Sequence, residues 1–207
     1  MKKLKKYLTS NKLKEEGYKM NVCVFYYDGF CEFEVVFAVN QFRDNICSVA
    51  LENRVYISEE KQKFLPDKTI QEINPEDIDL FIIPGGNPVQ LYEKTELKEF
   101  MLKLNEKNKF IAGICGGAEL MAYHGLLNNK EANGDTEGFR VDESNKHIYE
   151  KINIVDKDVV RDGNCITSIG QAFIEFSVEL GKVMNIYKND EEIKDTYNWL
   201  KNIKDKK

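Results

Sequence analysis

The stretch of sequence that decides the fold is Phe110-Ile111-Ala112-Gly113-Ile114-Cys115-Gly116-Gly117-Ala118-Glu119-Leu120-Met121-Ala122. Its first five residues form a short apolar run with the length of a buried strand, and the residues after Gly117 read as the first turns of a helix. Cys115 therefore lies where a strand turns sharply into a helix, which is the geometry of a nucleophile elbow.

This position favours a reactive thiol. The free backbone N–H groups and the positive end of the following helix stabilise a thiolate, so we expect the pKa of Cys115 to lie below its reference value of about 8.5. Gly116 and Gly117 have no Cβ that would block a substrate or forbid the tight turn. A buried structural cysteine beside two turn glycines is an equally good interpretation of this stretch alone.

Two further segments point to the same edge of the sheet. The apolar run Leu80–Ile83 ends in Gly85-Gly86, and Val22–Tyr27 is followed by a segment with carboxylates. In a parallel sheet the carboxyl ends of the strands share one edge, where ligands bind. We therefore expect the N–H groups of Gly86 and Gly116 to lie close together and to form an oxyanion hole.

These residues resemble the site motifs of the ThiJ/PfpI superfamily, in the segments Asp28–Glu34, Ile83–Gly86 and Gly113–Ala118. A fourth segment, Arg161–Ser168, resembles a late strand of the family and leads into the start of its closing helix at Gly170–Phe176. The match runs from about residue 20 to about residue 184, and four motifs in the right order make it specific.

The resemblance implies a flavodoxin-like three-layer sandwich, related to the class I glutamine amidotransferases. The alternation of strands and helices by itself predicts an α/β fold with an open, mostly parallel central sheet and helices on both faces. We expect one domain over residues 20–207, with a C-terminal helix from about residue 190. Residues 1–19 are interpreted as a basic extension outside this domain.

The expected elements follow from the hydrophobic periodicity. Strands are predicted at Asn21–Tyr27, Ile46–Leu51, Val55–Ser58, Leu80–Ile83, Phe110–Ile114, Ile152–Val155, Val159–Arg161 and Cys165–Thr167. Helices are predicted at Glu32–Phe42, Glu96–Asn108, Ala172–Met184 and Glu191–Ile203, besides the one after Cys115. In the first helix, one side is formed by Phe33, Val36, Phe37 and Asn40, and the apolar face is widened by Val35, Val39 and Phe42. Phe64–Ile73 is expected to be an irregular connection, and Asn128–Glu150 a hairpin or loop.

Glu34 is the carboxylate that matches the family motif, five residues after Gly29, whereas Glu32 does not match it. In the family this residue hydrogen-bonds the nucleophile. Two anions in one cleft would repel each other, so we expect Glu34 to be protonated or to share a proton with Cys115. It would then serve as a general acid and base. The alternative is a glutamate that only favours the dipole of a helix start.

Other residues are weaker site candidates. Gly85, Asn87, Gly117 and Glu119 are possible rim residues, although Glu119 also reads as a solvated helix carboxylate. Cys31 is either a second thiol near the site or a packed turn cysteine. The remaining cysteines are interpreted as inert core residues in strands: Cys23, Cys47 and Cys165.

The histidines do not complete a triad. Many relatives place a histidine directly after the cysteine or about twenty residues later, and here these positions are Gly116 and Asp135. His124 lies roughly 13 Å along the helix from Cys115, too far to take its proton. His147 is expected to be solvated. The sequence thus predicts a dyad of Cys115 and Glu34.

Composition limits the classes of function. With 42% hydrophobic residues and no apolar run of about 18 residues, we expect a soluble protein without membrane spans. Five cysteines without a CxxC pair fit a reducing, cytoplasmic compartment. Two distant histidines give no metal-ligand pair, and no phosphate loop or GxGxxG follows a strand, so neither metal nor cofactor is expected.

Charge is unevenly distributed along the chain. Residues 1–19 hold seven Lys and two Glu, a net charge of +5, so the rest carries −10 of the total of −5. An acidic body of this kind argues against nucleic acid as a partner.

Three functions remain. The first is cofactor-free, glyoxalase III-like or deglycase-like chemistry of Cys115 on a small electrophile, a reactive carbonyl. The second is a redox-sensing stress protein whose Cys115 is oxidised. The third and least favoured is a PfpI-type peptidase, because that type carries a histidine where this chain has Gly116. The resemblance also implies a homodimer.

Overall fold

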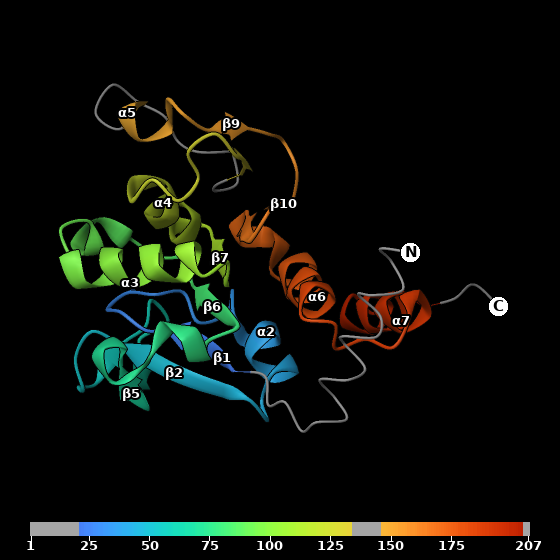
Figure 1. Ribbon diagram of the computed structural model, residues 1–207. Coiled ribbons are helices and arrows are strands. Elements are labelled where there is room, and N and C mark those ends of the chain that lie inside the picture. Colours follow the sequence, from blue (N-terminus) through green and yellow to red (C-terminus); the bar gives the residue numbers. More distant parts are fainter. Residues whose placement is uncertain (1–20, 134–145, 205–207) are drawn as a thin grey trace.

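A seven-stranded sheet forms the centre of the protein, as described by a computed structural model over residues 21–133 and 146–204 (Figure 1). Its strand order is β10-β11-β7-β6-β1-β2-β5, and every neighbouring pair is parallel except β10 and β11. The strands are β1 Val22–Phe25, β2 Ile46–Ala50, β5 Lys68–Thr69, β6 Leu80–Ile83, β7 Phe110–Ile114, β10 Val159–Asp162 and β11 Cys165–Ser168.

Helices cover both faces of this sheet, as the alternation of elements predicted (Figure 1). The longer ones are α2 Val36–Gln41, α3 Thr95–Glu106, α4 Gly116–Tyr123, α6 Phe173–Val183 and α7 Asp190–Leu200. The fold is therefore the expected three-layer α/β sandwich. Three short 3-10 helices lie in the connections on either side of β6: η1 Ile70–Glu72, η2 Pro75–Asp77 and η3 Pro88–Leu91. A fourth, η4 Gly170–Ala172, precedes α6.

Alternating strand residues supply the two halves of the core. In β1, Cys23 and Phe25 pack with the apolar side chains of α3 and α4. Val22 and Val24 point to the other face and pack with those of α2 and α6. Because β1, β6 and β7 are buried on both faces, they read as continuous apolar runs in the sequence.

The helix expected at Glu32–Phe42 begins later, at Val36, and Glu34 lies in the turn that precedes it. The predicted apolar face is wrong in part, because Phe33 is 49% and Val36 is 41% exposed. The Cys31 N–H donates to the Gly85 carbonyl (2.9 Å), which holds this turn against the loop after β6 and sets where the helix starts. The core receives Val35 and Phe42, as predicted, together with Ala38.

The connection expected at Phe64–Ile73 contains more regular structure than predicted. It adds β5 to the edge of the sheet, after a small hairpin of β3 Tyr56–Ile57 and β4 Lys63–Phe64. β3 lies within the predicted strand Val55–Ser58, whereas β4 and β5, with two residues each, leave too short a hydrophobic pattern to be recognised.

The segment expected as a hairpin or loop at Asn128–Glu150 contains β8 Glu131–Ala132 and α5 Lys146–Tyr149. β8 pairs with β9 Asn153–Ile154. Residues 134–145, with Asp135, and the extension 1–19 lie outside the described residues.

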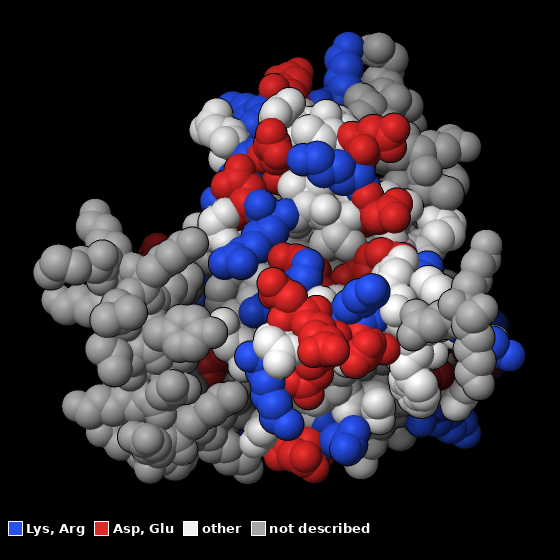
Figure 2. Space-filling model, turned by 90° about the vertical axis from the view of Figure 1, so that its right-hand side faces the viewer, with Lys and Arg blue, Asp and Glu red and all other residues white. Residues whose placement is uncertain are grey.

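The surface carries charges of both signs. On the face that Figure 2 shows, Lys and Arg are interspersed with Asp and Glu, so its described residues form no continuous basic surface. Within the described residues, no helix is both long enough and apolar enough to cross a bilayer.

Candidate active site

Cys115 occupies the predicted elbow between β7 and α4. Its backbone has φ 53° and ψ −123°, a left-handed conformation that side chains other than glycine rarely adopt. The Cys115 N–H donates to the Ser168 carbonyl at the end of β11 (2.8 Å), which ties the strained residue to the neighbouring strand. Such strain costs on the order of 1–3 kcal/mol and persists only where the surrounding structure enforces it. The expected backbone strain is confirmed.

Glu34 lies against this cysteine. Its side chain is only 3% exposed, and its Oε2 accepts a hydrogen bond from the Gly85 N–H (2.8 Å). A second hydrogen bond joins the Glu34 carboxyl to the Cys115 side chain. The prediction that Glu34 and not Glu32 faces the thiol is confirmed, since Glu32 is half-buried and its N–H bonds to Glu60 instead (3.2 Å).

Two glycines make this close approach possible. A Cβ on Gly85 would lie 2.1 Å from Glu34 Oε2 and 2.7 Å from the Cys115 Cβ. A Cβ on Gly170 would lie 2.7 Å from Glu34 Oε1 and 3.5 Å from the Cys115 Sγ. Gly170 was not among the predicted site residues, although it begins the segment that resembles the closing helix of the family. Its position at the end of β11 was the signal that could have placed it at the site.

Backbone N–H groups converge on the sulfur. Hydrogen bonds from the N–H groups of Gly116 and Gly86 to the sulfur lower the pKa of Cys115. The two glycines are pressed together, because a Cβ on Gly116 would lie 2.1 Å from the Gly86 carbonyl oxygen. Two donors beside a nucleophile are the arrangement that an oxyanion hole requires.

The net electrostatics of Cys115 differ from the prediction. Burial, followed by the negative charge of Glu34, raises the pKa of Cys115 to about 11, against the lowering by the two N–H groups. The expectation of a pKa below 8.5 is thus wrong in direction, because the sulfur is removed from water and faces a carboxyl group.

Glu34 has the character that was expected. Burial raises the pKa of Glu34 to about 7, although its hydrogen bonds with Gly85 and Cys115 act in the opposite direction. A carboxyl group with this pKa is half-protonated near neutral pH. When it holds the proton, it presents no negative charge to Cys115 and can donate a hydrogen bond to a thiolate.

The weaker candidates have other roles in the structure. Asn87 is exposed, and its Oδ1 caps η3 by accepting from the Val89 N–H (3.1 Å). Gly117 lets α4 pack on β6, since a Cβ there would lie 2.2 Å from the Ile83 carbonyl oxygen. Glu119 accepts a hydrogen bond from the hydroxyl of Tyr92, the residue that follows η3.

Tyr27 and Cys31 also border the site. The Tyr27 hydroxyl, which is buried, donates to the Gly85 carbonyl (2.6 Å) and so fixes the loop that holds Glu34. Sequence reasoning placed Tyr27 in a strand and missed this contact, which no local pattern reveals. Cys31 is half-buried, and burial followed by the charges of Glu34 and Cys115 raises its pKa to about 12.

Neither histidine is placed to serve the thiol. His124 is buried at the end of α4, where its ring bonds the Leu91 carbonyl and its Nε2 has no partner among the described residues. His147 is exposed in α5. Residues 21–133 and 146–204 contain no group of three or more His, Cys, Asp or Glu that could hold a metal ion.

The sequence matches a family profile and several known proteins. The sequence profile of the DJ-1/PfpI family matches residues 20–182. An uncharacterised protein of Methanocaldococcus jannaschii is 33% identical over 134 residues, which are 62% of this chain and 62% of that protein. The protein named deglycase PfpI of Pyrococcus furiosus is 31% identical over 105 residues, 49% of this chain and 59% of that one. The alignments thus span about three fifths of the length of these two relatives.

Solved structures show the same fold. A DJ-1 superfamily protein of Agrobacterium tumefaciens superposes with a TM-score of 0.75 at 20% identity, over 89% of this chain and all of that one. The family profile covers all the elements that carry Glu34, Gly85, Cys115 and Gly170. The chain belongs to the DJ-1/PfpI family.

Proposed function

We propose that this chain is a cofactor-free enzyme that uses Cys115 to attack small reactive carbonyls, with 2-oxoaldehydes as the substrate class. The observation that carries the proposal is the convergence of three groups on one strained sulfur. These are the Glu34 carboxyl and the N–H groups of Gly86 and Gly116. The set supplies a nucleophile, a proton carrier and donors for an oxyanion.

The first step is addition. The Cys115 thiolate adds to the aldehyde carbon, the carbonyl oxygen becomes an oxyanion held by Gly86 and Gly116, and Glu34 gives that oxygen its proton. The product is a hemithioacetal. Glu34, now a carboxylate, is the base left beside the same carbon.

The second step moves a proton within the substrate. Glu34 removes the proton from the former aldehyde carbon and returns a proton to the neighbouring carbon. The hydroxyl proton of the hemithioacetal moves to the ketone oxygen on that neighbouring carbon, and the product is a thioester. Water then hydrolyses the thioester and releases the thiol. For methylglyoxal the balance is methylglyoxal plus water giving lactate, with no electron carrier. A carboxyl group with a pKa of about 7 suits both directions of proton transfer.

The names of relatives support an enzyme of this general kind. The alignment with deglycase PfpI covers 49% of this chain, and a protein named a deglycase from Pyrococcus abyssi is 24% identical over 72% of it.

The test is turnover of methylglyoxal without glutathione, measured as aldehyde loss and lactate gain. We expect activity in the wild type and a loss to the uncatalysed rate in Cys115→Ala. His147→Ala is the matched control, because that side chain is exposed on α5 and should leave the rate unchanged. Equal rates in the wild type and Cys115→Ala would reject the proposal.

A second function, redox sensing, is favoured by one observation. The protonated Glu34 would donate a hydrogen bond to an oxidised Cys115, a residue that is half-buried. Mass spectrometry after dilute hydrogen peroxide distinguishes the two functions. Oxygen addition confined to Cys115 in a protein without carbonyl turnover would support the sensor.

A further inference from the structure

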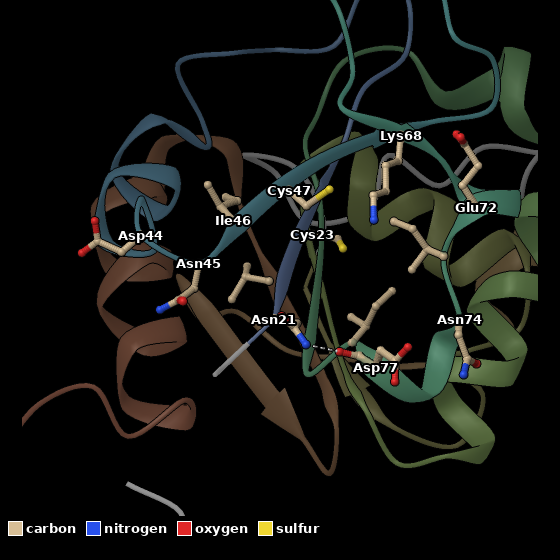
Figure 3. A pocket seen from close by; sticks show the side chains of 13 residues that line it. Asn21, Cys23, Asp44, Asn45, Ile46, Cys47, Lys68, Glu72, Asn74 and Asp77 are labelled. Carbon is tan, nitrogen blue, oxygen red and sulfur yellow. Dashed lines mark hydrogen bonds between the residues drawn. The ribbon is translucent and has the colours of Figure 1, made fainter. Parts of the chain in front are cut away.

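A second group of thiols lies at the opposite end of the sheet from Cys115. A cavity of about 270 Å³ opens where β1 and β2 begin, and the segment from β5 through η2 forms its other wall (Figure 3). Cys23, Cys47 and Lys68 are among its lining residues. None of them takes part in the proposed carbonyl chemistry.

The two cysteines are neighbours on adjacent strands. Cys23 of β1 is paired in parallel register with Cys47 of β2, so both side chains leave the same face of the sheet and enter the same cavity. Neighbouring strands are about 4.7–4.9 Å apart. Zinc–sulfur bonds in proteins are about 2.3 Å long, and two bonds of roughly this length in a straight line would place the two sulfurs roughly 4.6 Å apart. The strand spacing therefore suits an ion held between the two sulfurs.

Lys68 supplies a positive charge at the same place. Figure 3 shows its side chain reaching into the cavity beside both cysteines. Its ammonium lowers the pKa of Cys23 and of Cys47, although burial, the larger influence, raises both. A pair of thiolates with one monovalent cation has a net charge of −1, and one lysine neutralises it.

We propose that Cys23 and Cys47 bind one Cu(I) ion as a two-coordinate dithiolate whose charge is balanced by Lys68. Thiolates are the ligands that a soft monovalent ion prefers. A tetrahedral zinc site needs four ligands, and the described part of the chain offers no cluster of even three. Binding is Cu⁺ plus two thiols giving the dithiolate complex and two protons, with no change of oxidation state.

The release of two protons makes the binding pH-dependent. Burial raises the pKa of Cys23 to about 12 and also raises that of Cys47, so both are thiols at neutral pH. Affinity should then rise about a hundredfold per pH unit, tenfold for each proton released. Asp67 acts on Cys47, and three further carboxylates line the same cavity: Asp44, Glu72 and Asp77. Their negative charges should attract the cation.

The experiment is an anaerobic Cu(I) titration against the chromophoric chelator bicinchoninate, with freshly reduced full-length protein. All variants carry Cys115→Ser, which removes the thiol of the candidate active site. We expect one Cu(I) per chain in this background and at least 100-fold weaker binding after Cys47→Ser or Cys23→Ala. The half-buried Cys47 makes the first of these changes the milder one for folding. Cys165→Ser, at a buried cysteine outside the cavity, is the matched control and should bind as the background does.

Lys68 has its own test. Lys68→Gln should weaken binding about tenfold, and Lys68→Arg, which keeps the charge, should restore it. X-ray absorption of the complex should show two sulfur ligands. One Cu(I) bound equally well after Cys47→Ser, or an affinity that does not change between pH 6.5 and 7.5, would overturn the proposal.

Discussion

At the scale of single residues, the pairing of Cys115 with Glu34 decides how the thiol behaves. The pKa of Cys115 is raised to about 11, first by burial and then by the charge of Glu34, while Gly116 and Gly86 oppose the rise. The thiol is therefore not activated simply by lying at a helix start. A proton on Glu34 removes the opposing charge, so the thiolate forms most readily when Glu34 is neutral.

Replacing Glu34 should separate the reactivity of the thiol from catalysis. In Glu34→Gln the opposing negative charge is absent, so the pKa of Cys115 falls and its alkylation by iodoacetamide moves to lower pH. Carbonyl turnover should nevertheless fall by about 10²–10⁴-fold, because the proton carrier is lost.

Rates of alkylation between pH 6 and 10, followed by mass spectrometry, check the first half of this prediction. His124→Ala and His147→Ala should leave the profile of Cys115 unchanged. A profile that depends on either histidine would mean that a histidine serves the thiol.

At the scale of elements, the loops at the carboxyl ends of the strands hold the site together. Gly86 has φ 113°, and a Cβ there would lie 2.2 Å from the Gly29 carbonyl oxygen. This contact brings the loop after β1, which leads to Glu34, against the loop after β6. The bridge between Phe30 and Gly86 belongs to the same contact.

Gly86→Ala and Gly29→Ala make a matched pair of variants. Both positions have positive φ, but the nearest atom to a Cβ on Gly29 is Glu59 Oε2, at 3.9 Å. Gly29→Ala should cost only the backbone strain of about 1–2 kcal/mol. Gly86→Ala adds the clash, which costs about 1–3 kcal/mol more, and displaces the N–H beside Cys115.

Urea unfolding measures the stability of both variants, and methylglyoxal turnover measures the site. Turnover should fall at least tenfold in Gly86→Ala and little in Gly29→Ala. Equal losses in the two variants would show that backbone strain alone, and not the contact between the loops, matters at Gly86.

How much the sequence revealed depended on the length of each pattern. β7 and its elbow were predicted residue for residue, because five apolar residues followed by Cys115 and two glycines leave little choice. The helix after β1 was placed too early, since its first residues form a turn held by Gly85, a distant residue that periodicity does not include. The roles of Gly170 and Tyr27 were not predicted for the same reason, because they depend on contacts between residues that are far apart in the sequence.

At the scale of the whole molecule, two buried titratable groups oppose each other in the pH dependence of stability. The pKa of Glu34 is raised to about 7, so its contribution is complete below about pH 4.5 and is lost as pH rises through 7. Burial lowers the pKa of His124 to about 4, so its contribution is complete above about pH 6.5 and is lost as pH falls towards 4. Between pH 4.5 and 6.5 the two slopes have opposite signs.

Replacing either side chain should leave the pH dependence of stability that the other one causes. In His124→Gln the stability relative to the wild type should rise as pH falls from 6.5 to 5, and in Glu34→Gln it should fall over the same range. Each slope approaches about 1.4 kcal/mol per pH unit at most. Urea unfolding at pH 5.0, 5.75 and 6.5 gives these differences. Parallel curves for the three proteins would contradict the burial of these ionisable groups as described.

The homodimer implied by the family resemblance stays a prediction. Phe33 and Val36 are exposed, and Phe33 packs edge-on against Phe173 (5.8 Å between ring centroids). We expect the dimer to form through this apolar surface. Sedimentation velocity of the wild type and of Phe33→Ser tests it. A wild type that sediments as a monomer at micromolar concentration would exclude a stable dimer.

The measurement that tests the central claim most directly is kcat/KM for methylglyoxal in Cys115→Ala, Glu34→Gln and the double variant. Residues that act as one unit are not additive, because the loss of either removes the whole function. If Cys115 and Glu34 form a catalytic dyad, the double variant will be no slower than Cys115→Ala alone. A Glu34→Gln enzyme that keeps most of the wild-type kcat/KM, or a double variant whose losses multiply, would contradict the dyad.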